Sequence, residues 1–210
     1  MKLWIVGAAL AATVSTAASA QSVTSTAYDQ PAPSWAKVVT FDSPLPSGFS
    51  LYGGKIVQGS VPGQTAAPAG DATKYLTTGA GQKSVLVADK GYQSVGFYWG
   101  SVDTYNTVSL YDTLGKLIAK FTGADLPPAT GDQSSGATNR YVSYTLDPGS
   151  LISGIKAIVF ESAGNAFEVD NVAFGTRPGT PASVPEPATV GLFGIGLAAL
   201  GRRVMKKRSA

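Results

Sequence analysis

The segment YQSVGFYW at residues 92–99 decides the fold of this 210-residue chain. Five of its eight residues are aromatic or valine, which favour strands, and none is charged. Side chains alternate between the two faces of a strand, so Phe97 and Trp99 share one face and Tyr98 points to the other. The segment therefore predicts a strand with at least one face in a hydrophobic core.

Strand-like runs of similar length lie on both sides of this segment, separated by turns rich in Gly, Pro and Asp. Predicted strands cover residues 35–42, 49–58 (interrupted by Gly53-Gly54), 73–78, 83–89, 107–111, 116–121, 140–146, 155–161 and 166–174, with a surface loop at 59–71. About ten short strands and few helical periods predict an all-β domain over residues 35–175, an antiparallel β-sandwich.

The first 20 residues have the composition of a secretory signal peptide, which implies a signal helix removed by signal peptidase. Lys2 provides the positive charge, residues 3–14 the apolar run, and Ala18-Ser19-Ala20 the small-residue cleavage site. The alternative is an N-terminal membrane anchor. Residues 21–34 are rich in Ser, Thr, Ala and Pro without periodicity, and they predict a flexible spacer.

The C-terminal segment has three parts in a fixed order. A linker at 176–184 leads to the triplet Pro185, Glu186 and Pro187, and residues 188–201 form an uncharged run of 14. A helix of that length reaches about 21 Å, short of the ~30 Å hydrocarbon core of a bilayer. A basic tail follows, consisting of Arg202, Arg203, Lys206, Lys207 and Arg208.

Residues 185–210 resemble the PEP-CTERM sorting signal of Gram-negative bacteria. The resemblance implies an exported protein whose short C-terminal hydrophobic helix is held transiently in the inner membrane, read by an exosortase and removed. It also implies a destination at the cell surface or in the extracellular matrix. The alternative is that the tail remains as a single-span anchor.

Two segments of the central domain resemble a group of exported PEP-CTERM proteins. They are GFYWGSVDTYNT at 96–107 and NAFEVDNVAF at 165–174. The central domain of that group is taken to be a jelly-roll-like sandwich. The Asp-Asn pair in the last strand also resembles the closing strand of many carbohydrate-binding jelly rolls. The resemblance implies a jelly-roll-like fold and an exported location, and it implies no reaction.

Composition excludes several kinds of function. The chain has no His and no Cys, which removes the commonest general base, the commonest zinc ligand, thiolate chemistry and disulfides. Six of its 16 basic residues are Lys2 and the five of the basic tail, so the rest carries ten against all 13 acidic residues. This mildly acidic balance argues against nucleic acid as a partner.

Oxygen-bearing side chains suggest a structural calcium site, the only cofactor that the sequence indicates. Asp103 and Asn106 follow a predicted strand, and Glu168 and Asp170 share one face of another. Asp42 and Asn171 are further candidate ligands. The alternative is that Asp103 and Asn106 only form a turn, while Glu168 and Asp170 lie on a solvated sheet face.

Aromatic residues near this turn are candidates for stacking on sugar rings, namely Tyr98, Trp99 and Tyr105. The alternative is that they belong to the core. No catalytic constellation is apparent, so we expect a non-enzymatic exported surface or matrix protein associated with exopolysaccharide. The alternative function is a secreted glycan-processing enzyme that uses carboxylates only, with Glu168 and Asp170 as one pair.

Overall fold

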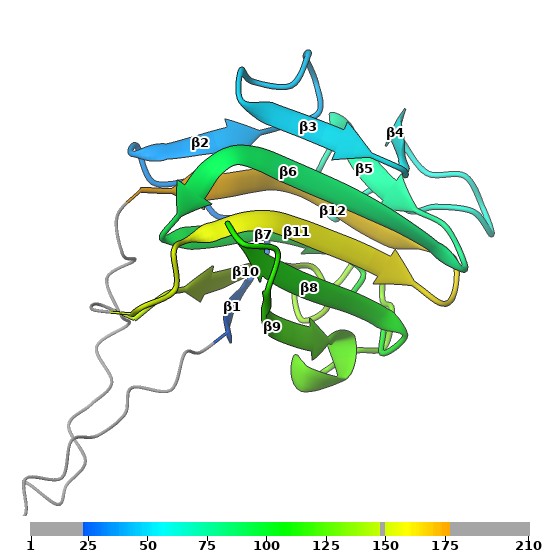
Figure 1. Ribbon diagram of the computed structural model, residues 1–210. Coiled ribbons are helices and arrows are strands. Elements are labelled where there is room, and N and C mark those ends of the chain that lie inside the picture. The colour runs from blue at the N-terminus through cyan, green and yellow to red at the C-terminus, as the bar shows by residue number, and fades with distance from the viewer. Residues whose placement is uncertain (1–22, 148–149, 177–210) are drawn as a thin grey trace, which may run out of the picture. The chain divides into compact units, whose positions relative to one another are not determined.

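Two antiparallel sheets face each other in a computed structural model, which describes residues 23–147 and 150–176 (Figure 1). The seven-stranded sheet contains, in spatial order, β1 (Val23–Ala27), β10 (Arg140–Thr145), β7 (Ser94–Gly100), β12 (Phe167–Gly175), β5 (Lys74–Thr78) and β4 (Lys55–Gln58), with β2 (Ala36–Val39) also paired to β12. The five-stranded sheet contains β3 (Phe49–Tyr52), β6 (Gln82–Tyr92), β11 (Ile155–Ser162), β8 (Asn106–Asp112) and β9 (Leu117–Thr122). One 3-10 turn, Gly123–Asp125, is the only helix among the described residues. The predicted all-β class is confirmed, and the fold is consistent with a jelly roll.

The core lies between the two sheets, and aromatic rings from β7, β11 and β12 meet there. The Trp99 ring stacks on Phe167 at 4.4 Å between centroids, and Phe97 meets Phe160 edge-on at 5.3 Å. None of these four side chains is more than 1% exposed. Residues 94–99 thus lie in the predicted core strand, β7, where alternation places Phe97 and Trp99 inward, while Tyr92 ends the preceding strand β6.

The Gly53-Gly54 turn carries the chain from one sheet to the other. β3 pairs with β6 in the five-stranded sheet, and β4 pairs with β5 in the seven-stranded sheet. Both glycines have positive φ, 72° and 65°. A Cβ on Gly53 would lie 2.3 Å from the Lys83 carbonyl oxygen, so only glycine fits this close approach. The predicted interruption is therefore a crossing point between the layers.

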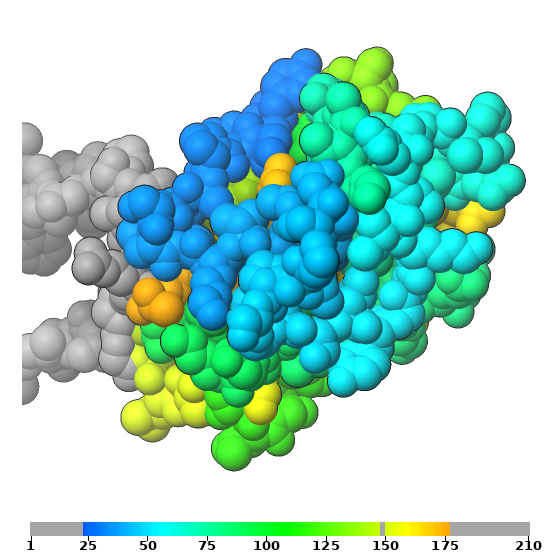
Figure 2. Space-filling model, turned by 90° about the horizontal axis from the view of Figure 1, so that it is seen from above, coloured from blue at the N-terminus to red at the C-terminus, as the bar shows by residue number. Residues whose placement is uncertain are grey.

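Residues 59–73, the covering segment, lie over the outer face of β12 and β7. The Tyr98 hydroxyl donates to the Ala69 carbonyl oxygen at 2.5 Å, and a Cβ on Gly100 would lie 2.9 Å from Pro68 Cγ. In Figure 2 the residues from β2 to β5, blue to cyan, form most of the visible surface, and only small parts of β12 emerge. The predicted surface loop is thus fixed against the sheet and buries part of its outer face.

The predicted spacer at 21–34 is wrong over residues 23–27, which form β1. This strand pairs with β10 along its full length, from Val23 opposite Tyr144 to Ala27 opposite Arg140. Thr24 Oγ1 lies 2.8 Å from Ser143 Oγ, and the Arg140 guanidinium donates to Ser25 Oγ at 3.0 Å. An edge strand needs only one hydrogen-bonded partner and little burial, so a polar sequence without apolar alternation can form it.

Several predictions fall outside the described residues. They are the signal helix at 1–20, the linker beyond 176, the short C-terminal helix and the basic tail. Within the described ranges, no helix has the length and apolar character needed to cross a bilayer.

Candidate functional site

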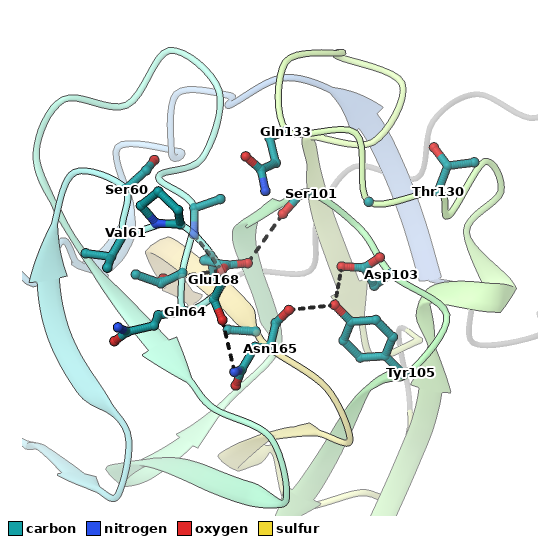
Figure 3. Close-up of a pocket in the computed structure, with 16 residues that line it drawn as sticks. Ser60, Val61, Gln64, Ser101, Asp103, Tyr105, Thr130, Gln133, Asn165 and Glu168 are labelled. Carbon is teal, nitrogen blue, oxygen red and sulfur yellow. Dashed lines mark hydrogen bonds between the residues drawn. The ribbon is translucent and has the colours of Figure 1, made fainter.

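A cavity of about 480 Å³ opens between four loops of the β-sandwich (Figure 3). Its walls come from residues 60–66 of the covering segment, 101–105 between β7 and β8, 130–133 before β10, and 165–168 at the start of β12. The volume lies within the usual range for small-molecule sites. The lining is mostly polar, with amides, hydroxyls and two carboxylates, and it includes one aromatic ring.

Glu168 forms the buried floor of this cavity and is only 2% exposed. Its Oε1 accepts hydrogen bonds from the Ala66 amide at 2.9 Å and Thr65 Oγ1 at 3.3 Å, and Oε2 accepts a longer one from Ser101 Oγ at 3.4 Å. Burial raises the pKa of Glu168 to about 7; these hydrogen bonds lower it, and the nearby Asp103 raises it. Burial therefore shifts the titration of this carboxyl group toward neutral pH.

Asp103 and Tyr105 form the opposite wall. The Tyr105 hydroxyl lies 2.8 Å from Asp103 Oδ2 and 3.0 Å from the Asn165 carbonyl oxygen. Burial raises the pKa of Asp103, and the hydrogen bond from Tyr105 opposes that shift. Gly131, with φ 67°, fits against this carboxylate because a Cβ there would lie 2.3 Å from Asp103 Oδ1. The two side chains of this wall are thus held by contacts with each other and with the backbone of two further loops, at Gly131 and Asn165.

Hydrogen bonds hold the covering segment in place beside the cavity. Asn165 Nδ2 donates to the Gly63 carbonyl oxygen at 3.2 Å, while Asn165 Oδ1 accepts from the Ala80 amide at 3.0 Å. The Tyr75 hydroxyl donates to the Gly59 carbonyl oxygen at 2.6 Å. These contacts fix a segment that has no regular secondary structure over most of its length, so the cavity is preformed.

The cavity brings together only two of the six candidate calcium ligands. Asp103 and Glu168 share the cavity, whereas Asn106 is fully buried, donating to the Ala166 carbonyl oxygen at 3.1 Å and accepting from Ser162 Oγ at 2.6 Å. Asp170 lies further along β12. In residues 23–147 and 150–176, no three acidic side chains are arranged to hold a metal ion. Calcium binding stays a prediction.

The alternative interpretation, that Glu168 and Asp170 lie on a solvated sheet face, is wrong. Their side chains are 2% and 1% exposed, because the covering segment lies over that face. Burial raises the pKa of Asp170 to about 8, with Asp71 and Asp42 adding to the shift and the Asn171 amide opposing it. Asp170 Oδ1 and Asp71 Oδ2 are buried without a hydrogen-bond partner within the described residues.

Two of the three predicted stacking residues are unavailable to a ligand. Trp99 is 0% exposed in the core, and Tyr98 is 1% exposed beneath the covering segment. Tyr105 is 36% exposed and lines the cavity. Both faces of β7 are covered, one by the core and one by the covering segment. The alternation of its side chains therefore could not show whether an aromatic ring was buried or available to bind a ligand.

Several lining residues were missed by the sequence-based reasoning, namely Ser60, Gln64, Thr65, Ser101, Thr130, Gln133 and Asn165. They lie in loops of small and polar residues that show no periodicity. Only their position next to strand ends hints at a site, and that signal is shared by many ordinary turns.

Residues 183–208 match the PEP-CTERM protein-sorting motif, which confirms the resemblance drawn from the C-terminal triplet, apolar run and basic tail. The match covers about an eighth of the chain. It supports an exported protein that is sorted through its C-terminal segment. No curated protein matches the chain.

Among solved structures, the β-sandwich is similar to the catalytic domain of a GH87 alpha-1,3-glucanase in complex with tetrasaccharides, with a TM-score of 0.43 and 15% identity over 75% of this chain and 30% of that chain. The catalytic unit of a GH87 alpha-1,3-glucanase from Streptomyces thermodiastaticus has a TM-score of 0.37 and 16% identity, over 72% of this chain and 28% of that one. CsCBM6-3 from Clostridium stercorarium, in complex with cellobiose, has a TM-score of 0.34 and 20% identity, over 61% and 87% of the two chains. This chain spans less than a third of either glucanase chain. Likeness at this level says nothing about the chemistry of the cavity.

Proposed function

We propose that this chain is a non-enzymatic exported protein whose β-sandwich binds an extracellular polysaccharide in the cavity around Glu168. In this proposal signal peptidase removes the N-terminal segment in a Gram-negative bacterium. The C-terminal helix then holds the chain transiently in the inner membrane until an exosortase acts on it. The sandwich ends at the cell surface or in the extracellular matrix.

The observation that carries the binding role is the chemistry of the cavity lining. A polysaccharide presents many hydroxyl groups, each of which can donate and accept hydrogen bonds. The cavity offers matching amide, hydroxyl and backbone groups from residues such as Gln64, Thr130 and Gln133. The Tyr105 ring adds an apolar surface on one wall, as sugar-ring stacking requires.

A binding experiment with immobilised extracellular polysaccharides tests this role. The full-length chain in detergent is passed over polysaccharides of different composition, beside a variant with Tyr105→Ala. We expect at least one polysaccharide to retain the chain and the variant to bind it at least tenfold more weakly. Tyr52→Ala is the matched control, because Tyr52 is 61% exposed and does not line the cavity. Retention by no polysaccharide, or equal weakening by both variants, would contradict the proposal.

Glycan hydrolysis is a second candidate function, favoured by the pairing of Glu168 with Asp103 in one cavity. A carboxyl group with its pKa raised to about 7 can act as a general acid, while a neighbouring carboxylate acts as base or nucleophile. Hydrolysis is separated from binding by Glu168→Gln, measured on the polysaccharide that the chain retains. If the unchanged chain releases reducing ends from the polysaccharide and this variant does not, the function is glycan hydrolysis rather than binding alone.

A further inference from the structure

Building on the proposed polysaccharide-binding role of this cavity, we propose that its preferred ligand is a glycan carrying free primary amines, such as a polymer of de-N-acetylated hexosamine.

The charges around the cavity are unbalanced. Two carboxylates, Glu168 and Asp103, line it, and none of its 16 lining residues is Lys or Arg. Within the described part of the chain, the one salt bridge joins Lys83 to Glu161, and neither residue lines the cavity. Negative charge without a counter-charge is unfavourable in a partly desolvated site. A positively charged ligand therefore gains a favourable electrostatic interaction with these carboxylates that a neutral ligand lacks.

The geometry of the acceptors suits an ammonium group, which has three N–H donors. Within the described residues, Glu168 Oε2 has only the 3.4 Å contact with Ser101 Oγ, and Tyr105 is the one side chain that donates to the Asp103 carboxylate, so both carboxylates can accept further hydrogen bonds. Figure 3 shows Glu168 at the centre of the lining residues and Asp103 beside Tyr105. Neutral groups such as Gln133 remain for the hydroxyl groups of the sugar. Charge-assisted hydrogen bonds are roughly twice as strong as neutral ones.

The same arrangement disfavours acidic sugars. A uronate or sulfate group would meet two carboxylates and no cation, and an N-acetyl group would replace the ammonium with a bulkier neutral amide. Specificity is thus expected to come from repulsion as well as attraction.

The test compares four probes in titrations of the full-length chain at pH 7. They are a glucosamine oligosaccharide, its fully N-acetylated form, a uronic acid oligosaccharide of equal length, and a simple diamine. We expect the free-amine oligosaccharide to bind at least tenfold more tightly than the N-acetylated form, and the uronate to bind most weakly. We expect the diamine to bind weakly, since it lacks the hydroxyl groups.

Three variants locate the preference. Glu168→Gln and Asp103→Asn should each bring the amine-to-acetyl affinity ratio close to one. Gln133→Lys adds a positive charge at an exposed position in the lining, so it should lower that ratio without disturbing a buried contact. Glu161→Gln is the matched control, because Glu161 lies outside the cavity and should leave the ratio unchanged.

The outcomes separate this inference from the proposed function. Equal affinity for the free-amine and N-acetylated forms would overturn the amine preference while leaving polysaccharide binding intact. The cavity would be a simple cation site instead if the diamine bound as tightly as the oligosaccharide. The same conclusion would follow if calcium displaced the oligosaccharide. Failure to bind any of the sugars, together with no retention in the polysaccharide experiment, would remove the proposed function itself.

Discussion

Glu168 and Asp170 are unusual acidic residues because both are buried on the outer face of a sheet. A loop that lies over β12 withdraws them from water, and no basic side chain forms a salt bridge with either within the described ranges. Burial accordingly raises the pKa values to about 7 and about 8. Protonation of these two groups is therefore linked to folding.

Stability is expected to fall as pH rises from about 5 to about 8. The folded chain binds protons at Glu168 and Asp170 more tightly than the unfolded chain does, so their contribution is complete below the ordinary carboxyl pKa values. It is lost as pH rises through about 7 and about 8. Urea unfolding should give a free energy of unfolding that is several kcal/mol lower at pH 8 than at pH 5. A free energy of unfolding that rises over this range would contradict the expectation.

Asp170→Asn is expected to stabilise the chain at pH 8, by about 1 kcal/mol. The variant removes a buried charge, and its amide group can donate to the neighbouring Asp71 Oδ2, which has no hydrogen-bond partner within the described residues. Thermal or urea unfolding measures the change. Asp89→Asn is the matched control at an exposed position and should have little effect. A destabilised Asp170→Asn variant would mean that the charge itself is needed, as it would be for a bound cation.

At the scale of elements, the covering segment connects the fold to the candidate site. It supplies one wall of the cavity, donates the Ala66 amide to Glu168, and lies against Gly100 through Pro68. The pocket therefore depends on a segment with hardly any regular secondary structure, held by side-chain hydrogen bonds.

Gly100→Ala is expected to loosen the covering segment. The new methyl group would lie 2.9 Å from Pro68 Cγ, so the segment must move away, at a cost of about 1–3 kcal/mol in unfolding free energy. Limited proteolysis should then cut within residues 59–73 faster than in the unchanged chain. Gly79→Ala is the matched control, because the nearest atom to its Cβ would be 3.5 Å away. Equal cleavage of both variants would contradict a fixed covering segment.

Most strands, though not β1, were predictable from sequence, because alternation and turn residues are local signals. Examples are β7 and the break at Gly53-Gly54. The covering segment was not, since Ala, Gly and Pro carry no periodicity that tells a free loop from a fixed one. Asp103 and Glu168 were identified as candidate residues, but the burial that makes Glu168 unusual comes from residues about a hundred positions away in the chain. That kind of long-range contact leaves no trace in a local pattern.

For the whole molecule, the sorting motif predicts what the mature chain contains. Intact mass measurement of the exported protein should show the loss of residues 1–20 and of the apolar run and basic tail that follow Pro187. Replacement of Pro185, Glu186 and Pro187 by Ala should leave Ala210 in place. Retention of Ala210 in the unchanged chain would instead indicate a permanent anchor. This measurement is independent of what the cavity binds.

The position of β1 links the site of signal-peptide cleavage to the tendency of the exported domain to associate with other copies. Only Gln21 and Ser22 separate the predicted cleavage site after Ala20 from the first residue of the strand that covers the β10 edge. A peptidase that cut a few bonds further along would leave β10 with a bare row of amide and carbonyl groups, a template on which other chains assemble. Accurate trimming at the N-terminus would thus help to keep neighbouring copies from joining edge to edge in a crowded matrix.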